Sequence, residues 1–173
     1  MPCNLNFNQC FTGCSYPRPI FTCFQNFISL FNQSGNTIVN PVIEASNTIS
    51  EIASPQIVAS GGNVIPTISF SQGSAISYDN AGTFTLINGR YLVSYNLSGV
   101  ISANGLNSYA IYLDGNILPA SAAVASGTIG SGASVSGSTF VQITAPTGAI
   151  TIRNTNSNPQ LVNSGSVTIQ KIN

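Results

Sequence analysis

The stretch that decides the fold is Thr83–Gly99, with the sequence TFTLINGRYLVSYNLSG. On either side of Asn88-Gly89 its apolar residues recur at every second position, which is typical of strands that bury one face. Asn and Gly tolerate the positive φ angles of a type I′ turn, so the sequence predicts a β-hairpin with its turn at these two residues. We expect the rest of the sheet to be built around this hairpin.

The chain from Gln56 onwards repeats this pattern of short apolar segments separated by Gly, Asn and Asp. Its regular punctuation predicts an all-β fold, a jelly-roll sandwich, rather than alternating strands and helices. The final strand begins with clean alternation, in which Val167 and Ile169 face one way. The predicted strands are 56–60, 64–70, 74–78, 82–87, 90–103, 107–113, 116–125, 127–144, 148–154 and 160–172.

The composition favours association with copies of the same chain. The 173 residues are 43% hydrophobic but only 5% charged, and the four basic and four acidic residues cancel. A surface with few charges and no net charge promotes association. Because a basic footprint is absent, we expect no nucleic-acid partner. Self-assembly is therefore the first functional prediction.

The same residues argue against catalysis and against a cofactor. The sequence contains no His, which is the commonest general base and metal ligand. It has no Gly-x-Ser-x-Gly motif, and its four acidic residues are scattered. We predict no catalytic residue, no cofactor-binding residue and no metal site, and hence no enzyme. We also expect no membrane span and see no secretory signal at the N-terminus.

All four cysteines lie in the first 23 residues: Cys3, Cys10, Cys14 and Cys23. They could pair locally and staple a small arm, or form intermolecular disulfides that lock the arm to a neighbouring subunit. A zinc site is a third alternative, although just one of the three spacings suits it. The sequence leaves these alternatives open.

Residues 1–36 are predicted to form a connector arm rich in Cys and Phe. Its first part has no clear period and reads as extended, and residues 20–31 have apolar side chains at helical spacing. A helix this short is marginal on its own, so its aromatic side chains must bury against something. We expect the arm to dock through Phe7, Phe11, Phe21, Phe24, Phe27 and Phe31.

Residues 37–60 are predicted to be a short apolar linker or a coiled-coil-like segment, which precedes a head domain over 61–173. Asn40-Pro41 could begin a helix, and Pro55 would end it. Four apolar residues follow at spacings of 3, 4 and 3, which would suit the seam of a three-stranded coil. This candidate trimer seam consists of Val42, Ala45, Ile49 and Ile52.

The predicted hairpin and the last strand also carry a family pattern. Asn88-Gly-Arg-Tyr91-x-Val-x-Tyr95, then Ala110-Ile-Tyr-Leu-Asp-Gly115 and Gly165-Ser-Val-Thr-Ile169, resemble the complement/tumour-necrosis-factor-like jelly roll. The variant they resemble most is the C-terminal domain of BclA-type exosporium filament proteins. This resemblance covers roughly residues 64–173 and implies a sandwich of ten strands that forms a tight homotrimer, without an active site. The chain lacks the collagen-like stalk of that family, and its N-terminal arm resembles the connectors of endospore appendage subunits.

Together these patterns predict a structural subunit of a self-assembling fibre on a spore surface or another extracellular surface. The implied partners are copies of the chain, as a homotrimer and then a filament, and a spore-coat or exosporium anchor protein. The alternative is a trimeric adhesin or receptor-binding head. Its candidate contacts are Tyr109, Tyr112 and the loop 153–158.

Overall fold

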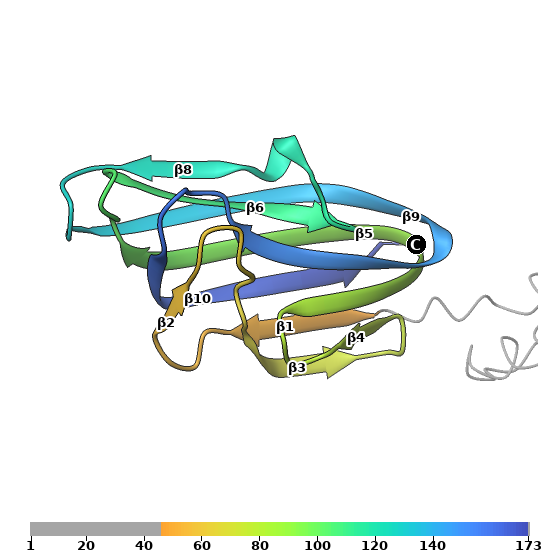
Figure 1. Cartoon of the computed structure of the whole chain (residues 1–173). Helices are drawn as coiled ribbons and strands as arrows, with labels where there is room; N and C mark the ends of the chain where they lie inside the picture. Colours follow the sequence, from red (N-terminus) through yellow and green to blue (C-terminus); the bar gives the residue numbers. More distant parts are fainter. Residues whose placement is uncertain (1–45, 173) are drawn as a thin grey trace, which may run out of the picture. The chain divides into compact units, whose positions relative to one another are not determined.

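The computed structural model describes residues 46–172, and in this part of the chain the regular structure is almost entirely β-strand (Figure 1). No helix among these residues is long and apolar enough to cross a membrane. The strands are β1 (Asn47–Glu51), β2 (Gln56–Val58), β3 (Thr67–Gln72), β4 (Ile76–Tyr78), β5 (Thr83–Val100), β6 (Leu106–Leu113), β7 (Asn116–Ile117), β8 (Ala123–Ser126), β9 (Gly132–Asn154) and β10 (Gln160–Lys171), with the short 3-10 helix η3 (Pro119–Ser121) before β8.

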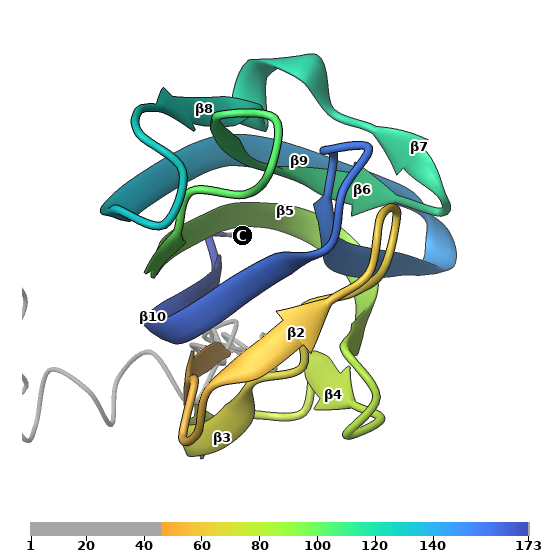
Figure 2. The ribbon, with the colours of Figure 1, turned by 60° about the vertical axis from the view of Figure 1, so that its left-hand side comes forward.

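Two long strands, β5 and β9, take part in both layers of the sandwich. The second half of β5 pairs with β10 on one side and with the first half of β9 on the other. Beyond β10 the layer continues with β1 and then β3. The first half of β5 pairs instead with β4 and with the second half of β9, which also pairs with β6. We call these sets the β10 layer and the β6 layer. Strands β6, β7 and β8 lie on one side of the domain, and β2, β3 and β10 on the other (Figure 2).

The predicted hairpin at Asn88-Gly89 is wrong, although both of its strands exist. Residues 83–100 form one strand, β5, whose two halves run on in the same direction and both pair with β9. A type I′ turn needs positive φ at both central residues, and here Gly89 has φ 150° whereas Asn88 has no positive φ. The pair instead forms an irregular corner, at which residues 144–146 of β9 lie opposite Asn88. The Asn88 side chain donates a hydrogen bond to the Thr144 carbonyl over 3.0 Å.

This corner reverses which positions of β5 face the core. Phe84 and Leu86 are buried before it, and Tyr91 and the alternate residues after it are buried as well. Two residues at the corner therefore shift the alternation by one position, so both halves of the strand turn their apolar side chains inward. The core contains these residues together with Val135, Val141, Ile143, Ile150, Ile152, Val162, Val167 and Ile169.

The predicted helix before Pro55 is also wrong where the structure describes it. Asn47–Glu51 is strand β1, which pairs with β10 on one side and with β3 on the other. The spacing of the apolar residues does not mark this strand, because its inward positions carry the polar Thr48 and Ser50, which are buried, while Ile49 faces outward. Since β1 and β2 both pair with β10, residues 47–51 and 56–58 belong to the sheet, although the sequence assigned them to a linker before the head domain.

Most of the other strand predictions agree with the structure within a few residues. The predicted segments 82–87 and 90–103 are the two halves of β5, and 127–144 and 148–154 correspond largely to the two halves of β9. The predicted strand 116–125 is broken, because β7 ends at Ile117 and the 3-10 helix η3 precedes β8. The extended arm and the helix predicted for residues 1–36 lie outside the described residues.

The close approach of β9 to η3 predicts a sharp cost for a side chain at Gly137. An added Cβ would lie 2.3 Å from the Ser121 carbonyl oxygen and 2.7 Å from the Tyr95 ring, so Gly137→Ala must displace backbone. We expect the free energy of unfolding to fall by about 1–3 kcal/mol, as for other overpacked sites. Gly132→Ala is the matched control, because nothing lies within 4 Å of its Cβ. Equal stability of the two variants in urea unfolding would contradict the packing described here.

Candidate interaction surface

The outer face of the β10 layer carries an apolar pair at its β9 edge. Phe140 of β9 is 75% exposed and lies directly opposite Leu92 of β5. Both residues fall on the outward positions of their strands, since the flanking Tyr91, Val93 and Val141 are buried. A Phe side chain exposed to this degree loses favourable burial energy unless another surface covers it.

A second apolar pair lies at the opposite edge of the same face. Phe70 of the edge strand β3 is 47% exposed and is paired with Ile49 of β1. The residues paired in turn with Ile49 across the neighbouring strands also face outward, and they are Thr168 of β10, Ser94 of β5 and Ser138 of β9. The two apolar pairs are therefore separated by a band of small polar residues.

This band forms an open groove of about 470 Å³ between the two apolar pairs. Hydroxyl and amide groups dominate its lining, which consists of Ser94, Tyr95, Asn96, Ser136, Gly137, Ser138, Ser166 and Thr168. Such small side chains leave the backbone accessible and allow a second surface to come close. The groove has no charged residue in its lining, so covering it with another protein surface requires no charge to be desolvated.

Charged side chains are confined to the ends of this face. Arg90 follows the corner of β5 and donates from Nε to Gln142 Oε1 over 2.8 Å. Glu51 ends β1 and is paired with Ser166 in the register. Sparse charge at the rim and none in the middle is the pattern of a protein–protein interface.

Three of the residues considered for a receptor contact are buried and structural. Tyr109 is fully buried. In the loop 153–158, Asn154 and Asn156 are buried, and Asn154 Nδ2 donates to the carbonyls of Val58, Ala59 and Asn158. Asn156 is hydrogen-bonded to Asn104, to Ser102 and to the Leu106 carbonyl. These amides connect the loops at one end of the domain. Of the candidate contacts, Tyr112, Arg153 and Asn158 are partly exposed, and Thr155 and Ser157 are exposed.

The buried Tyr95 of β5 links this strand to β6 and to η3. Tyr95 Oη donates to the backbone carbonyl of Tyr109 or Ser121, at 2.8 and 2.9 Å. Burial raises the pKa of Tyr95 to about 12, and burial together with the nearby Tyr95 raises the pKa of Tyr109. Because the unfolded chain ionises first, near pH 10, this contribution to stability is full below pH 10 and is lost as the pH rises towards 12.

The structure places two of the four predicted seam residues. Ile49 lies on the outer face of the β10 layer, next to Phe70, whereas Ile52 is 8% exposed and packs in the core. These two residues therefore do not share one face, as a helical seam would require. The remaining seam residues, the six arm phenylalanines and the four cysteines lie outside the described residues: Val42, Ala45, Phe7, Phe11, Phe21, Phe24, Phe27, Phe31, Cys3, Cys10, Cys14 and Cys23.

Sequence reasoning missed Phe140 and Leu92, although the signal was present. In residues 132–143 the inward positions carry Val135, Val141 and Ile143, and Phe140 falls out of phase among Ser and Gln. An aromatic residue on the polar side of an alternating strand indicates a surface that is covered by something else. Among residues 46–172 no group of three or more His, Cys, Asp or Glu could hold a metal ion.

Comparison with known proteins relates this chain to others through its fold. No family model matches the sequence, and no curated protein matches it significantly. Among solved structures, the tumour necrosis factor Eiger from S. frugiperda matches with a TM-score of 0.60 at 12% identity, covering 75% of this chain and 92% of that chain. Murine APRIL matches with a TM-score of 0.59 at 11% identity, covering 73% of this chain and 99% of that chain.

The globular domain of zebrafish complement 1qA matches with a TM-score of 0.50 at 14% identity, covering 73% of this chain and 94% of that chain. The fold is a jelly roll of the tumour-necrosis-factor and C1q type. This confirms the all-β sandwich predicted from the strand spacing and the fold implied by the family resemblance. Identities this low relate the proteins by fold alone.

Proposed function

We propose that this chain is a structural subunit that assembles with copies of itself through the outer face of the β10 layer. The observation that carries the proposal is the exposed Phe140, next to the half-buried Leu92, on a sheet face whose middle is uncharged and hydroxyl-rich. A monomer exposes such a pair to water at a cost in free energy, and a second copy removes it.

The two edges of this face suggest how the copies meet. Phe140–Leu92 lies at one edge and Phe70–Ile49 at the other, so one edge of a copy can cover the opposite edge of the next. Such a heterologous contact closes into a ring when the rotation permits. A ring of three copies, as the resemblance to the tumour-necrosis-factor-like jelly roll implies, is the assembly we propose for the head.

We assign the joining of heads into a fibre to residues 1–36. The arm carries six Phe and all four Cys of the chain, which suits docking on an adjacent unit followed by disulfide formation. We place the fibre on a spore surface or another extracellular surface, anchored there by a coat or exosporium protein. The proposal assigns no catalytic activity, in keeping with the absence of His from the sequence.

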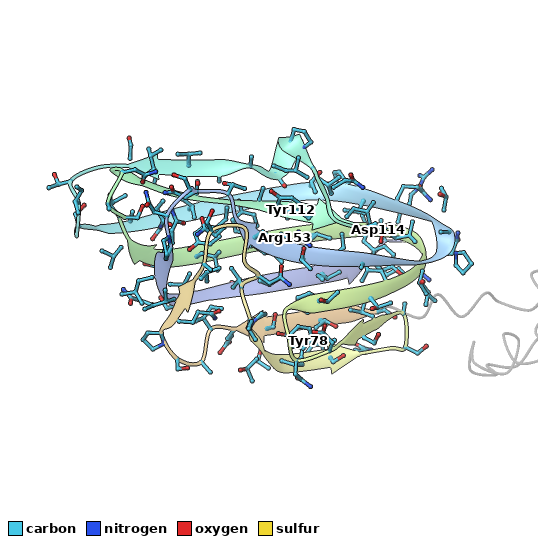
Figure 3. The ribbon with its side chains drawn as sticks, viewed as in Figure 1. Tyr78, Tyr112, Asp114 and Arg153 are labelled. Atoms are coloured by element: carbon cyan, nitrogen blue, oxygen red, sulfur yellow. The ribbon has the colours of Figure 1, made fainter. Side chains whose placement is uncertain are left out.

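A receptor-binding or adhesin head is the second candidate. The observation that favours it is the partly exposed Tyr112–Arg153 pair on the β6 layer, which the proposed self-association leaves open (Figure 3). The two functions are compatible, since one uses the outer face of the β10 layer and the other that of the β6 layer.

Replacing Phe140 with Ser tests the self-association surface. Each copy would lose the burial of one Phe side chain, about 1.5–3 kcal/mol, so the dissociation constant should rise roughly 10- to 100-fold. Val124→Ser is the matched control, because Val124 is 63% exposed on β8 in the β6 layer. We expect light scattering coupled to size exclusion to show dissociation of Phe140→Ser alone. Identical masses for both variants and the parent chain, with unchanged circular dichroism, would overturn the proposed interface.

Deletion of residues 1–23 tests the fibre separately. The truncated chain keeps every described strand, so its heads should still associate while filaments disappear from negative-stain electron micrographs. A variant with all four cysteines replaced by Ser is the control, and its filaments should form but dissociate at lower denaturant concentration. Filaments formed by the truncated chain would contradict the connector role of the arm.

A further inference from the structure

Arg153 is held rigidly on the outer face of the β6 layer. Its guanidinium carbon lies 4.8 Å from the centroid of the Tyr112 ring, and its Nε donates to Thr151 Oγ1 over 3.0 Å. Figure 3 shows the two labelled residues next to each other, on β9 and β6. Stacking on an aromatic face and a fixed Nε bond leave the planar fork of an arginine with few alternative orientations.

The surrounding register explains why both side chains lie flat on the sheet. Arg153 is paired with Ala110 and Tyr112 with Thr151, so each long side chain has a small one opposite it. Ala110 is fully buried and Thr151 is 5% exposed, although both face outward, because the two larger side chains cover them. The pair is therefore a built element of this surface rather than two independent side chains in solvent.

The charge of Arg153 has no acidic partner among residues 46–172. Within this part of the chain its guanidinium contacts Tyr112 and Thr151, and its two terminal nitrogens keep their donors for an outside group. A partly buried cation is usually paired, because desolvating an unpaired charge is unfavourable. The fork of a guanidinium matches the two oxygens of a carboxylate.

Hydroxyl groups adjoin this cation on the same face. Thr155 lies two residues beyond Arg153 on the chain and is exposed, and its Oγ1 is 3.0 Å from Oγ of the buried Ser108. Thr83 is paired with Thr151 on the other side. Neighbouring hydroxyl groups suit the hydroxyls of a sugar better than the apolar side chains of a peptide.

We propose that Arg153 and Tyr112 form a binding site for an acidic sugar of a surface glycan. The carboxylate of a uronic acid would accept hydrogen bonds from the terminal nitrogens of Arg153, and the exposed Thr155 would contact the sugar hydroxyls. This site lies on the β6 layer, so it is independent of the self-association proposed for the β10 layer.

Saturation-transfer difference NMR on the full chain tests the site, because the method tolerates large assemblies. We expect signal transfer to sodium glucuronate, much weaker transfer to glucose, and competition by acetate or sulfate only at concentrations at least ten-fold higher than by glucuronate itself. Arg153→Gln should reduce the affinity for glucuronate at least ten-fold, and Arg153→Lys should retain part of it. Arg90→Gln is the matched control, since Arg90 is exposed and its Nε is likewise bound to a single side-chain oxygen.

Three results would overturn the proposal. They are equal transfer to glucose and glucuronate, an unchanged affinity in Arg153→Gln, or an equal loss in Arg90→Gln. Competition by sulfate at the same concentration as glucuronate would contradict the sugar assignment, because the hydroxyl contacts would then contribute nothing. Light scattering of Arg153→Gln should give the mass of the parent assembly, so failure of this site and failure of the self-association surface are distinguished.

Discussion

The corner between the two halves of β5 determines the remainder of the fold. At Asn88-Gly89 the strand leaves one layer and enters the other, and three residues of β9 lie opposite Asn88. The positive φ of Gly89 and the bond from Asn88 to the Thr144 carbonyl hold this geometry. Because the corner shifts the alternation by one position, Phe84 and Tyr91 both point into a single core. Without that shift, one half of β5 would present its apolar residues to water.

The outer face of the β10 layer is a consequence of the same constraint. Once Tyr91, Val93, Tyr95 and Leu97 are fixed inward, Leu92 must face outward, and its register partner Phe140 faces outward with it. The middle of this face is filled with Ser, Thr and Asn, and its charged residues Arg90 and Glu51 lie at the ends, so the middle has little that opposes the approach of another protein. The β6 layer has a different character, because its fixed cation Arg153 lies over Tyr112. One sandwich thus has one outer face that is uncharged in its middle and another that carries a cation fixed over an aromatic ring.

Much of this architecture could be predicted from the sequence, since period-two alternation and turn residues marked nearly every strand. The errors came from residues whose local preference fits two structures. Asn-Gly suits a hairpin and also a corner, and only the tertiary pairing with β9 decides between them. The residues around Ile49 fit a helix seam by their apolar spacing and a strand by their β-branched side chains, and the pairing with β10 and β3 selects the strand. For the surface, Phe140 could have been found because it lies on the polar side of an alternating strand. The stack of Arg153 on Tyr112 could not, because the two residues are 41 positions apart and only the pairing of β6 with β9 brings them together.

The central claim is that another copy of the chain covers the outer face of the β10 layer. Electron cryomicroscopy of the assembled full-length protein measures this directly, because it locates Phe140 relative to the neighbouring subunit. The account predicts that the Phe140–Leu92 edge of one copy packs against the Phe70–Ile49 edge of the next, with the groove between them closed over. An assembly in which this face is open to solvent and the copies meet elsewhere would contradict it.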